Sequence, residues 1–199
     1  MLFRSDGRVA EVTGGVERVL SPSGLIGPFG LDRMPDGSVL SADGLAVNRI
    51  GADGVATVIM SLLADLPGMA VDVAHHGDDP LVLLERGQVL RRHPDGRLTT
   101  VAGRLTDATT LTSSPRGGAH LVERRPGRVL HLDGEGGVTE VASGLDRPMA
   151  VAEGPDGTLW VSRRDGVTGV RDGAVVAEIG GLDRPQGIAV FDGAVWVAD

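Results

Sequence analysis

The densest group of side chains that could bind a metal ion is the segment His75-His76-Gly77-Asp78-Asp79. Imidazole nitrogens and carboxylate oxygens are both ligands that metal sites use. Neighbouring side chains on a strand point to opposite sides, whereas on a loop both histidines could reach one ion. We expect the segment to be a solvated loop between two strands, and keep a metal site formed by His75, His76 and Asp78 as the alternative.

Nucleophilic catalysis has no signature in the sequence. There is no cysteine, which excludes thiolate nucleophiles and disulfides. The serines at Ser21, Ser23, Ser113 and Ser114 have neither a recognisable nucleophile turn nor a histidine partner nearby in the sequence. A serine, a histidine and an acid that act together need only meet in space, so the sequence does not locate such a group.

The charge balance limits the partners. The chain carries 27 acidic residues against 19 lysines and arginines, a formal net charge of −8, which repels phosphate backbones at long range. We therefore expect no nucleic-acid partner, and we interpret the arginines that crowd residues 86–128 as a solvated face. No apolar run approaches the roughly 20 residues of a membrane span, and residues 1–12 do not resemble a signal peptide. We expect no membrane partner and take the cytoplasm as the default location.

The elements that must position these side chains repeat along the chain. Leu145–Ser162 and Leu182–Asp199 both begin with Leu-Asp-Arg-Pro, which recurs after 37 residues, and both contain a Trp-Val strand. Weaker copies occupy residues 27–43, 66–85 and 105–123. The equivalent positions 30, 68, 110, 150 and 187 are separated by 38, 42, 40 and 37 residues. Propeller blades have this period of about 40 residues.

A second repeated unit, a strand, a turn and an alternating strand, lies between these copies. Its turns carry Asp-Gly at 6–7, 53–54, 95–96 and 172–173, a strong hairpin signal because glycine accepts a positive φ. Each period therefore contains four short strands, and no convincing helical period is present. The sequence predicts an all-β propeller with four-stranded antiparallel blades. We expect one domain over residues 1–199, with repeat units at about 1–26, 27–63, 64–103, 104–143, 144–180 and 181–199.

The two ends of the chain each carry half a blade. Residues 1–13 resemble the second hairpin of a blade, and residues 182–199 resemble the first. Pairing these hairpins would complete five blades and remove two exposed edges. We predict this closure, and the alternative is a fragment of a six- or seven-bladed propeller.

Particular segments resemble known propeller families. Residues 27–54 resemble an NHL repeat, with the Asp-Gly turn and a strand that ends in Ala-Asp. Residues 89–102 and 155–162 are similar to SMP-30/gluconolactonase, strictosidine-synthase-like and virginiamycin-lyase-like propellers. At the level of the repeat the resemblance covers essentially the whole chain. It implies the architecture more than an activity, since these families share blades and differ in their channels.

In such propellers, the loops between blades and the corners in the middle of each blade share one face around a central channel. The ligand-binding candidates at this channel-mouth face are Phe29, Asp32, Asp107, Asp146, Arg147, Met149, Asp183, Arg184 and Gln186. The mid-blade corners carry Asp43, Glu85, Glu123, Arg163 and Asp199. Because an acid recurs in four of these five corners, we interpret it as a cap that accepts backbone hydrogen bonds rather than as a binding group.

SMP-30-like lactonases hold a divalent cation in the channel with Glu, Asn and Asp oxygens. The equivalent positions here are Phe29, Pro67, Thr109, Met149 and Gln186, none of them a carboxylate. We therefore expect no cofactor, with calcium as the alternative that the resemblance implies. Asp32 is the one acid at a position where the other copies have alanine or threonine. His120 takes the strand position of Trp160 and Trp196, and we expect all three to pack in the blade core, with His131 on the surface.

Two functions of different classes remain. The first is a non-catalytic binding or scaffold propeller that recognises a protein or a small ligand on the channel-mouth face. The alternative is an SMP-30/gluconolactonase-like or virginiamycin-lyase-like enzyme acting on a small molecule at the central channel, with a divalent cation as an option. Its residues would be Asp32, Asp107, Asp146 and Arg147.

Overall fold

The structure, a computed structural model, describes residues 2–3, 9–13, 16–21, 25 and 29–198. These residues form short strands and contain no helix. The strands are β1 (Leu2–Phe3), β2 (Val9–Thr13), β3 (Val16–Ser21), β4 (Gly30–Arg33), β5 (Val39–Ala42), β6 (Ala46–Ile50), β7 (Ala56–Ser61), β8 (Ala70–His76), β9 (Asp79–Leu84), β10 (Gln88–Arg92), β11 (Leu98–Ala102), β12 (Ala108–Ser113), β13 (Ala119–Glu123), β14 (Arg128–Leu132), β15 (Val138–Ala142), β16 (Ala150–Glu153), β17 (Leu159–Arg163), β18 (Gly166–Arg171), β19 (Ala174–Gly180), β20 (Gly187–Phe191) and β21 (Ala194–Ala198).

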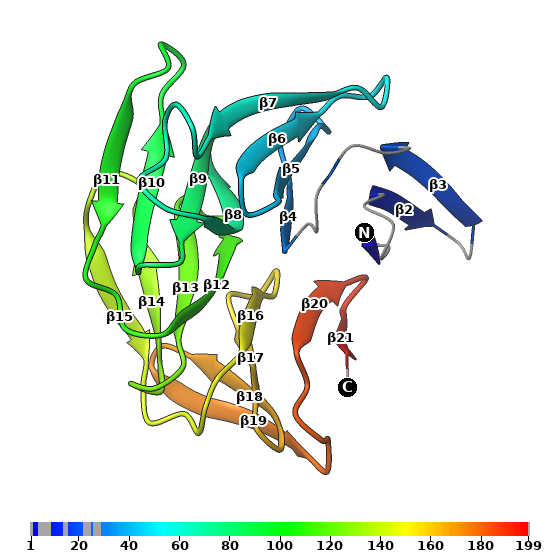
Figure 1. Cartoon of the computed structure of the whole chain (residues 1–199). Helices are drawn as coiled ribbons and strands as arrows, with labels where there is room; N and C mark the ends of the chain where they lie inside the picture. The colour runs from blue at the N-terminus through cyan, green and yellow to red at the C-terminus, as the bar shows by residue number, and fades with distance from the viewer. Residues whose placement is uncertain (1, 4–8, 14–15, 22–24, 26–28, 199) are drawn as a thin grey trace.

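Four sheets are four-stranded antiparallel meanders: β4–β7, β8–β11, β12–β15 and β16–β19. Their first strands, followed by β20, contact one another in chain order and surround the centre of the molecule (Figure 1). Tight turns close the hairpins, and Gly54, Gly96 and Gly173 adopt the positive φ that their Asp-Gly sequences predict. The prediction of an all-β propeller with four-stranded antiparallel blades is confirmed.

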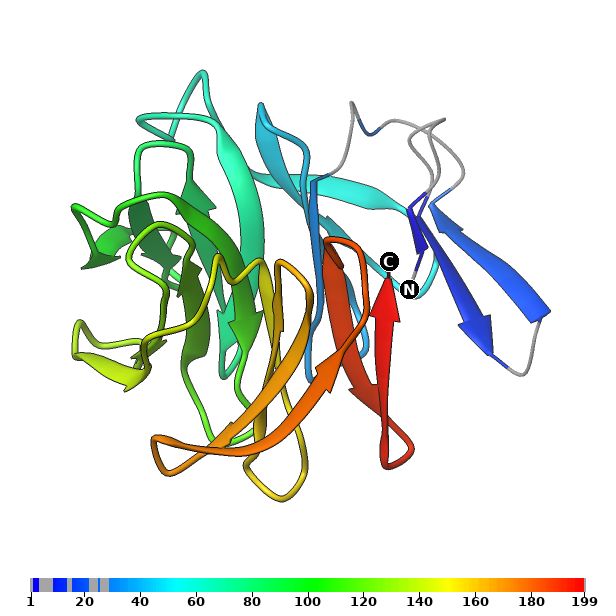
Figure 2. The same cartoon turned by 90° about the horizontal axis from the view of Figure 1, so that it is seen from below.

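The predicted blade shared by the two ends is not formed. Among the described strands, β20 and β21 pair only with each other, while β1, β2 and β3 form a separate sheet. The closure would require β21 to pair with β1, but β1 pairs only with β2 among the described strands. Figure 2 shows β20–β21 beside the sheet β16–β19, which its inner strand contacts. The predicted five-blade closure is therefore wrong for the described residues.

The apolar cores lie between neighbouring sheets rather than within any one of them. One core joins Leu40 of β5 to Val82 of β9, the next joins Leu83 of β9 to Leu121 of β13, and a third joins Val122 of β13 to Val161 of β17. The sheets β8–β11 and β12–β15 bury both faces against their neighbours because a single four-stranded sheet cannot hide its apolar residues alone. This radial packing fixes the inner strands, which carry most of the side chains discussed below.

The last hairpin departs from this packing. Trp196 on β21 is 62% exposed, so the expectation that it lies in a blade core is wrong among the described residues. Trp160, its repeat equivalent, is half-buried against Gly169, where a Cβ would lie 3.1 Å from its ring. His120 is buried as expected.

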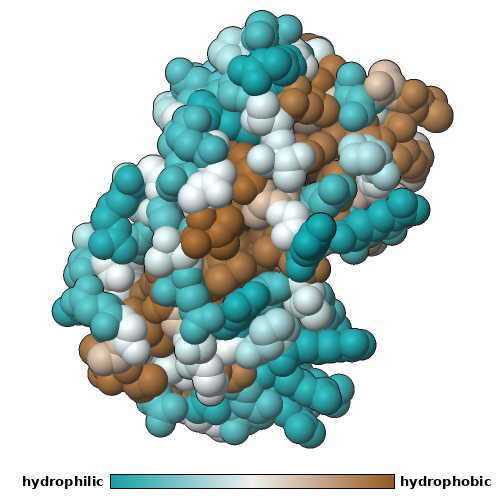
Figure 3. Space-filling model, turned by 90° about the vertical axis from the view of Figure 1, so that its left-hand side faces the viewer, coloured by the Kyte–Doolittle hydropathy of each residue, from teal (hydrophilic) through white to brown (hydrophobic). Residues whose placement is uncertain are grey.

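On the side of the molecule that includes the outer strands β11 and β15, hydrophilic residues cover most of the surface around a recessed apolar band (Figure 3).

Candidate functional site

The repeated Leu-Asp-Arg-Pro motif forms the loops that lead into the inner strands β16 and β20. In the first copy Leu145 and Pro148 are buried, while Arg147 is exposed. Arg147 has φ 48° and Arg184, its equivalent, has φ 57°, so both turn the chain in the left-handed region. The apolar residues anchor each loop to the body, and the arginine side chain remains at the surface.

Backbone hydrogen bonds hold these loops against the mid-blade corners. The Arg124 N–H donates to the carbonyl of Asp107 at 3.0 Å, and the Arg164 N–H donates to that of Asp146 at 3.3 Å. The Arg184 N–H donates to the carbonyl of Arg164 at 3.0 Å, which connects the last loop to the preceding sheet. The repeat therefore places an arginine at each junction of loop and corner.

These arginines line one pocket of about 590 Å³ at the loop face. Its lining residues are Arg124, Arg147, Met149, Arg164, Asp165, Leu182, Asp183, Arg184 and Gln186. A second pocket of about 620 Å³ shares Arg124 and Arg147 with the first. Its other lining residues are Asp107, Arg125, Pro126, Gly127, Leu145 and Asp146. The two pockets therefore form one hollowed region, called the arginine pocket below.

The arginines of this pocket differ in how they are paired. Arg124 makes a bidentate ion pair with Asp107, with both N···O distances 3.0 Å, and this pair raises the pKa of Arg124 further. Arg184 lies 3.4 Å from Asp183. Arg147 and Arg164 form no ion pair within the part of the chain that the structure describes. Two guanidinium groups are thus available to a ligand.

The structure brings together five of the nine sequence-predicted ligand residues. Arg147, Met149, Asp183, Arg184 and Gln186 line the first of the two pockets. Asp107 and Asp146 line the second, where the Asp107 carboxylate is occupied by the ion pair described above. Sequence reasoning missed Arg124 and Arg164. The signal was present, since each directly follows a mid-blade corner residue, Glu123 or Arg163.

The remaining two candidates lie elsewhere. Phe29 is 62% exposed next to Gly44, at the start of the inner strand β4. Asp32 lies on β4 itself, where its Oδ2 is 2.6 Å from Nδ1 of His75 on β8. The Ser113 hydroxyl of β12 donates a short hydrogen bond to the same carboxylate oxygen and accepts one from the His75 backbone N–H at 2.7 Å. We call Asp32, His75 and Ser113 the central cluster.

The expectation of a loop at His75 and His76 is wrong, because both residues belong to β8. Their side chains have different partners: His75 contacts Asp32, whereas Nδ1 of His76 accepts a hydrogen bond from the Gly118 N–H at 3.1 Å. Within the described residues no group of three or more His, Asp or Glu side chains is arranged to hold a metal ion. The metal alternative built on His75, His76 and Asp78 is therefore not supported.

A second carboxylate lies close to the central cluster. Asp72 accepts hydrogen bonds from the backbone N–H groups of Leu111 at 2.8 Å and Val73 at 2.9 Å. Burial raises the pKa of Asp72 to about 7 despite these bonds, and the nearby charge of Asp32 acts in the same direction. Asp72 can therefore change its protonation state near neutral pH.

Two of the mid-blade corner acids act as caps. Asp43 is buried and accepts hydrogen bonds from the Ala46 N–H at 2.7 Å and from Nδ2 of Asn48 at 3.1 Å. Glu123, which is also buried, accepts from the Thr106 N–H and, at 2.6 Å, from Nε of Arg128. These contacts fit the capping interpretation. Glu85 is exposed, and Asp199 lies outside the described residues.

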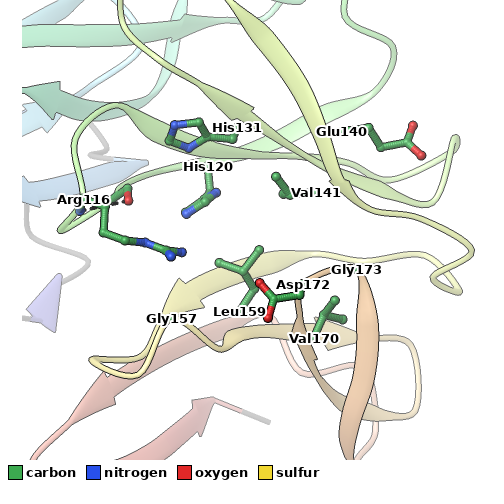
Figure 4. A pocket seen from close by; sticks show the side chains of 11 residues that line it. Arg116, His120, His131, Glu140, Val141, Gly157, Leu159, Val170, Asp172 and Gly173 are labelled. Atoms are coloured by element: carbon green, nitrogen blue, oxygen red, sulfur yellow. Dashed lines mark hydrogen bonds between the residues drawn. The ribbon is translucent and has the colours of Figure 1, made fainter.

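A third pocket, of about 470 Å³, lies between the sheets β12–β15 and β16–β19 and is shown in Figure 4. His120 and a half-buried His131, which the sequence analysis placed on the surface, are among its lining residues. The Glu153 carboxylate of β16 receives hydrogen bonds from Ser114 at 2.6 Å and from Nε2 of His120 at 2.8 Å, and pairs with Arg116 at 2.5 Å. This network links two adjacent sheets.

The protonation states in this network follow from burial and hydrogen bonding. Burial lowers the pKa of His120, which keeps its imidazole neutral. Burial alone would raise the pKa of Glu153, but the hydrogen bonds from Ser114 and His120 outweigh it and lower that pKa. His120 therefore donates its Nε2 proton to a carboxylate.

No family model matches the sequence, and no curated protein matches it either. Among solved structures, the chain is similar to virginiamycin B lyase from Staphylococcus aureus, with a TM-score of 0.70 and 18% identity over 87% of this chain and 63% of that one. It is similar to a gluconolactonase from Xanthomonas campestris, with a TM-score of 0.73 and 18% identity over 94% and 77% of the two chains.

A calcium-binding protein from Agrobacterium tumefaciens, a regucalcin, gives a TM-score of 0.71 and 18% identity over 94% and 72% of the two chains. At these identities the likeness establishes the fold alone, a β-propeller. The chain spans less than two thirds of the lyase's length. The described residues also contain no helix long and apolar enough to cross a membrane.

Proposed function

We propose that this propeller is a binding module that holds a small organic anion in the arginine pocket of its loop face. The observation that carries the proposal is that four guanidinium groups line one pocket, two of them, Arg147 and Arg164, without an ion pair in the described part of the chain. Guanidinium groups bind carboxylate and phosphate oxygens through two parallel hydrogen bonds. A ligand with such a group would replace the missing partner of these arginines.

The other lining residues suit an organic anion rather than a bare ion. Met149 and Leu182 offer apolar contact, and the Gln186 side chain adds an amide that can donate or accept. A pocket of about 590 Å³ falls in the range of small-molecule sites. The acids Asp165 and Asp183 at the same pocket would favour ligands that also carry a hydroxyl or amine donor.

Titration calorimetry with citrate and with inorganic phosphate tests the proposal. We expect citrate to bind the wild-type chain. The double variant that combines Arg147→Gln and Arg164→Gln should bind citrate at least tenfold more weakly. Arg97→Gln is the matched control, since Arg97 is an exposed arginine that pairs with Asp95 away from the pocket. The proposal fails if the control weakens binding as much as the double variant, or if neither probe binds.

A second candidate is an enzyme that acts on a small molecule, as the names gluconolactonase and virginiamycin B lyase describe for two of the similar structures. The observation in its favour is Asp32, which is held beside an imidazole at the centre of the molecule. The residues assigned to this function in the sequence analysis are otherwise divided, because Asp107, Asp146 and Arg147 lie in the arginine pocket.

The divalent cation that the fold suggests does not fit the residues present. The positions that the sequence resemblance assigns to the cation, Phe29, Pro67, Thr109, Met149 and Gln186, offer no carboxylate. Hard cations such as calcium need about six to eight oxygen ligands. We therefore expect no calcium-dependent rise in melting temperature at millimolar calcium, and assays of this candidate against a panel of lactones need no added metal.

A further inference from the structure

The imidazole of the central cluster is fixed in one tautomer. Nδ1 of His75 is 2.6 Å from Oδ2 of Asp32 and 2.8 Å from the Ser113 hydroxyl oxygen. An ionised carboxylate can only accept, so the proton of a neutral His75 lies on Nδ1. Nε2, at the other side of the ring, then carries a lone pair, and no hydrogen bond in the described part of the chain engages it.

The cluster is also held rigidly while remaining accessible. Its members come from three successive inner strands, β4, β8 and β12, which contact one another. The Asp32 and His75 side chains are 17% and 18% exposed, so water reaches them. A carboxylate that fixes the tautomer and orientation of an imidazole also stabilises the imidazolium formed when Nε2 takes a proton.

Ser113 does not occupy the position of a nucleophile. A serine activated by histidine receives its contact from the ring nitrogen opposite the carboxylate, which here is Nε2. Ser113 instead contacts Nδ1, the nitrogen that faces Asp32, and donates its own proton to Asp32. The hydroxyl therefore positions the carboxylate and the ring, and the nucleophile that the geometry allows at Nε2 is a water molecule.

We propose that His75, oriented by Asp32 and Ser113, is the general base that activates water for hydrolysis of a small open-chain carboxylic ester. This inference rests on the enzymatic candidate above and assigns its catalytic and positioning residues. Nε2 of His75 removes a proton from water as the water oxygen forms a bond to the acyl carbon. The bond from the acyl carbon to the alcohol oxygen then breaks, and the imidazolium returns the proton to that oxygen. The products are a carboxylic acid and an alcohol.

Hydrolysis of 4-nitrophenyl acetate and 4-nitrophenyl butyrate by the wild-type chain and four variants tests these roles. We expect His75→Ala to lower kcat/KM about 100-fold or more, the size of effect typical of a general base. Asp32→Asn should lower kcat at least tenfold with little change in KM, because an amide permits the wrong tautomer. Ser113→Ala should retain activity within about tenfold, as a positioning residue does when water is the nucleophile.

His76→Ala is the matched control, since its neighbouring imidazole contacts Gly118 instead of the central cluster. We expect it to keep the wild-type rate. Added imidazole, corrected for its own reaction with the ester, should restore part of the activity of His75→Ala and none of the activity of Asp32→Asn. A variant that was merely misfolded would not respond to imidazole.

The outcomes separate the inference from the function on which it rests. A wild-type rate no higher than buffer with both esters, together with no turnover of the lactone panel, removes the enzymatic candidate and this inference with it. A wild-type rate that His75→Ala retains removes the inference alone. Loss of activity in Ser113→Ala equal to that in His75→Ala would make serine the nucleophile and overturn the role of water. Citrate binding by the arginine pocket is unaffected by any of these results.

Discussion

The side chain of Asp72 on β8 fills the space that a side chain at residue 30 of β4 would need. A Cβ built on Gly30 would overlap Oδ1 of Asp72 and lie 2.7 Å from its Cα. The close approach of these two inner strands therefore depends on a glycine at one and a small carboxylate at the other. It also accounts for the low hydration of the Asp72 carboxylate.

This contact predicts that Gly30→Ala destabilises the fold. The added methyl group must push β4 and β8 apart, and overpacking of this kind costs about 1–3 kcal/mol. Urea unfolding followed by circular dichroism measures the loss. Gly180→Ala is the control, because no atom lies within 4 Å of a Cβ at that position and its φ is not positive. Equal stability of the two variants would contradict the contact.

Asp72 should also make stability depend on pH. Its folded pKa of about 7 lies above the ordinary value of 3.8, so the folded state binds the proton more tightly than the unfolded chain does. The contribution of Asp72 to the free energy of unfolding is fully present below about pH 4. It is lost as the pH rises to about 7, by roughly 1.4 kcal/mol per pH unit at most. Asp72→Asn removes this term.

The measurement is the difference in unfolding free energy between wild type and Asp72→Asn at pH 4, 5.5 and 7.5. The difference should shift in favour of the variant as the pH rises, whatever the constant cost of the altered hydrogen bonds to Leu111 and Val73. A difference that is flat across this range would show that Asp72 is ionised throughout.

The capping interpretation predicts that replacing a buried corner acid lowers stability more than replacing an exposed one at the equivalent position. Glu123→Gln weakens the hydrogen bonds to the Thr106 N–H and the Arg128 guanidinium, and we expect a loss of about 1–3 kcal/mol because these groups are left without a charged acceptor. Glu85→Gln, at an exposed corner, should change stability by less than about 0.5 kcal/mol. Thermal unfolding compares the two, and a comparable loss in both would reject the role of burial.

The burial of His120 predicts that stability depends on pH with the sign opposite to that of the Asp72 effect. Because burial lowers its pKa below the ordinary 6.5, the unfolded chain binds the proton more tightly. The stability that His120 contributes is present above about pH 6.5 and is lost as the pH falls below it. Replacing His120 with Gln should flatten the stability curve between pH 6.5 and 5, measured as melting temperature. An unchanged slope would mean that His120 is protonated inside the folded protein.

The repeat predicted some of the residues of the arginine pocket and not others. Arg147 and Arg184 were found because a tetrapeptide recurs, and the fold places both in equivalent loops at one pocket. Arg124 and Arg164 were missed because they sit in different strand connections, which only the backbone bonds to Asp107 and Asp146 bring to the same pocket. Local sequence repeats predict local turns, and the assembly of turns from different sheets depends on their packing.

The central cluster shows the opposite case, since no signal in the sequence joins Asp32, His75 and Ser113. The pairing of β8 with β9 shifts register between Ala70 and Asp72, and that of β12 with β13 shifts between Ala108 and Thr110. Such irregularities change which side chains face the centre. Simple alternation along a strand therefore does not predict which residues meet there. Strand β8 also continues through His75 and His76, into the segment that was expected to be a loop.

The sequence by itself determined the class of fold, because hairpins form between neighbouring segments and their turn residues and alternation are written locally. It also determined the repeat and hence the equivalent loops. The tertiary structure alone decided that the described strands of the two ends form separate sheets, that Trp196 is exposed although Trp160 is half-buried, and which polar groups meet at the centre. These depend on contacts between sheets far apart in the chain, where side-chain packing and the irregular register of each strand set the geometry.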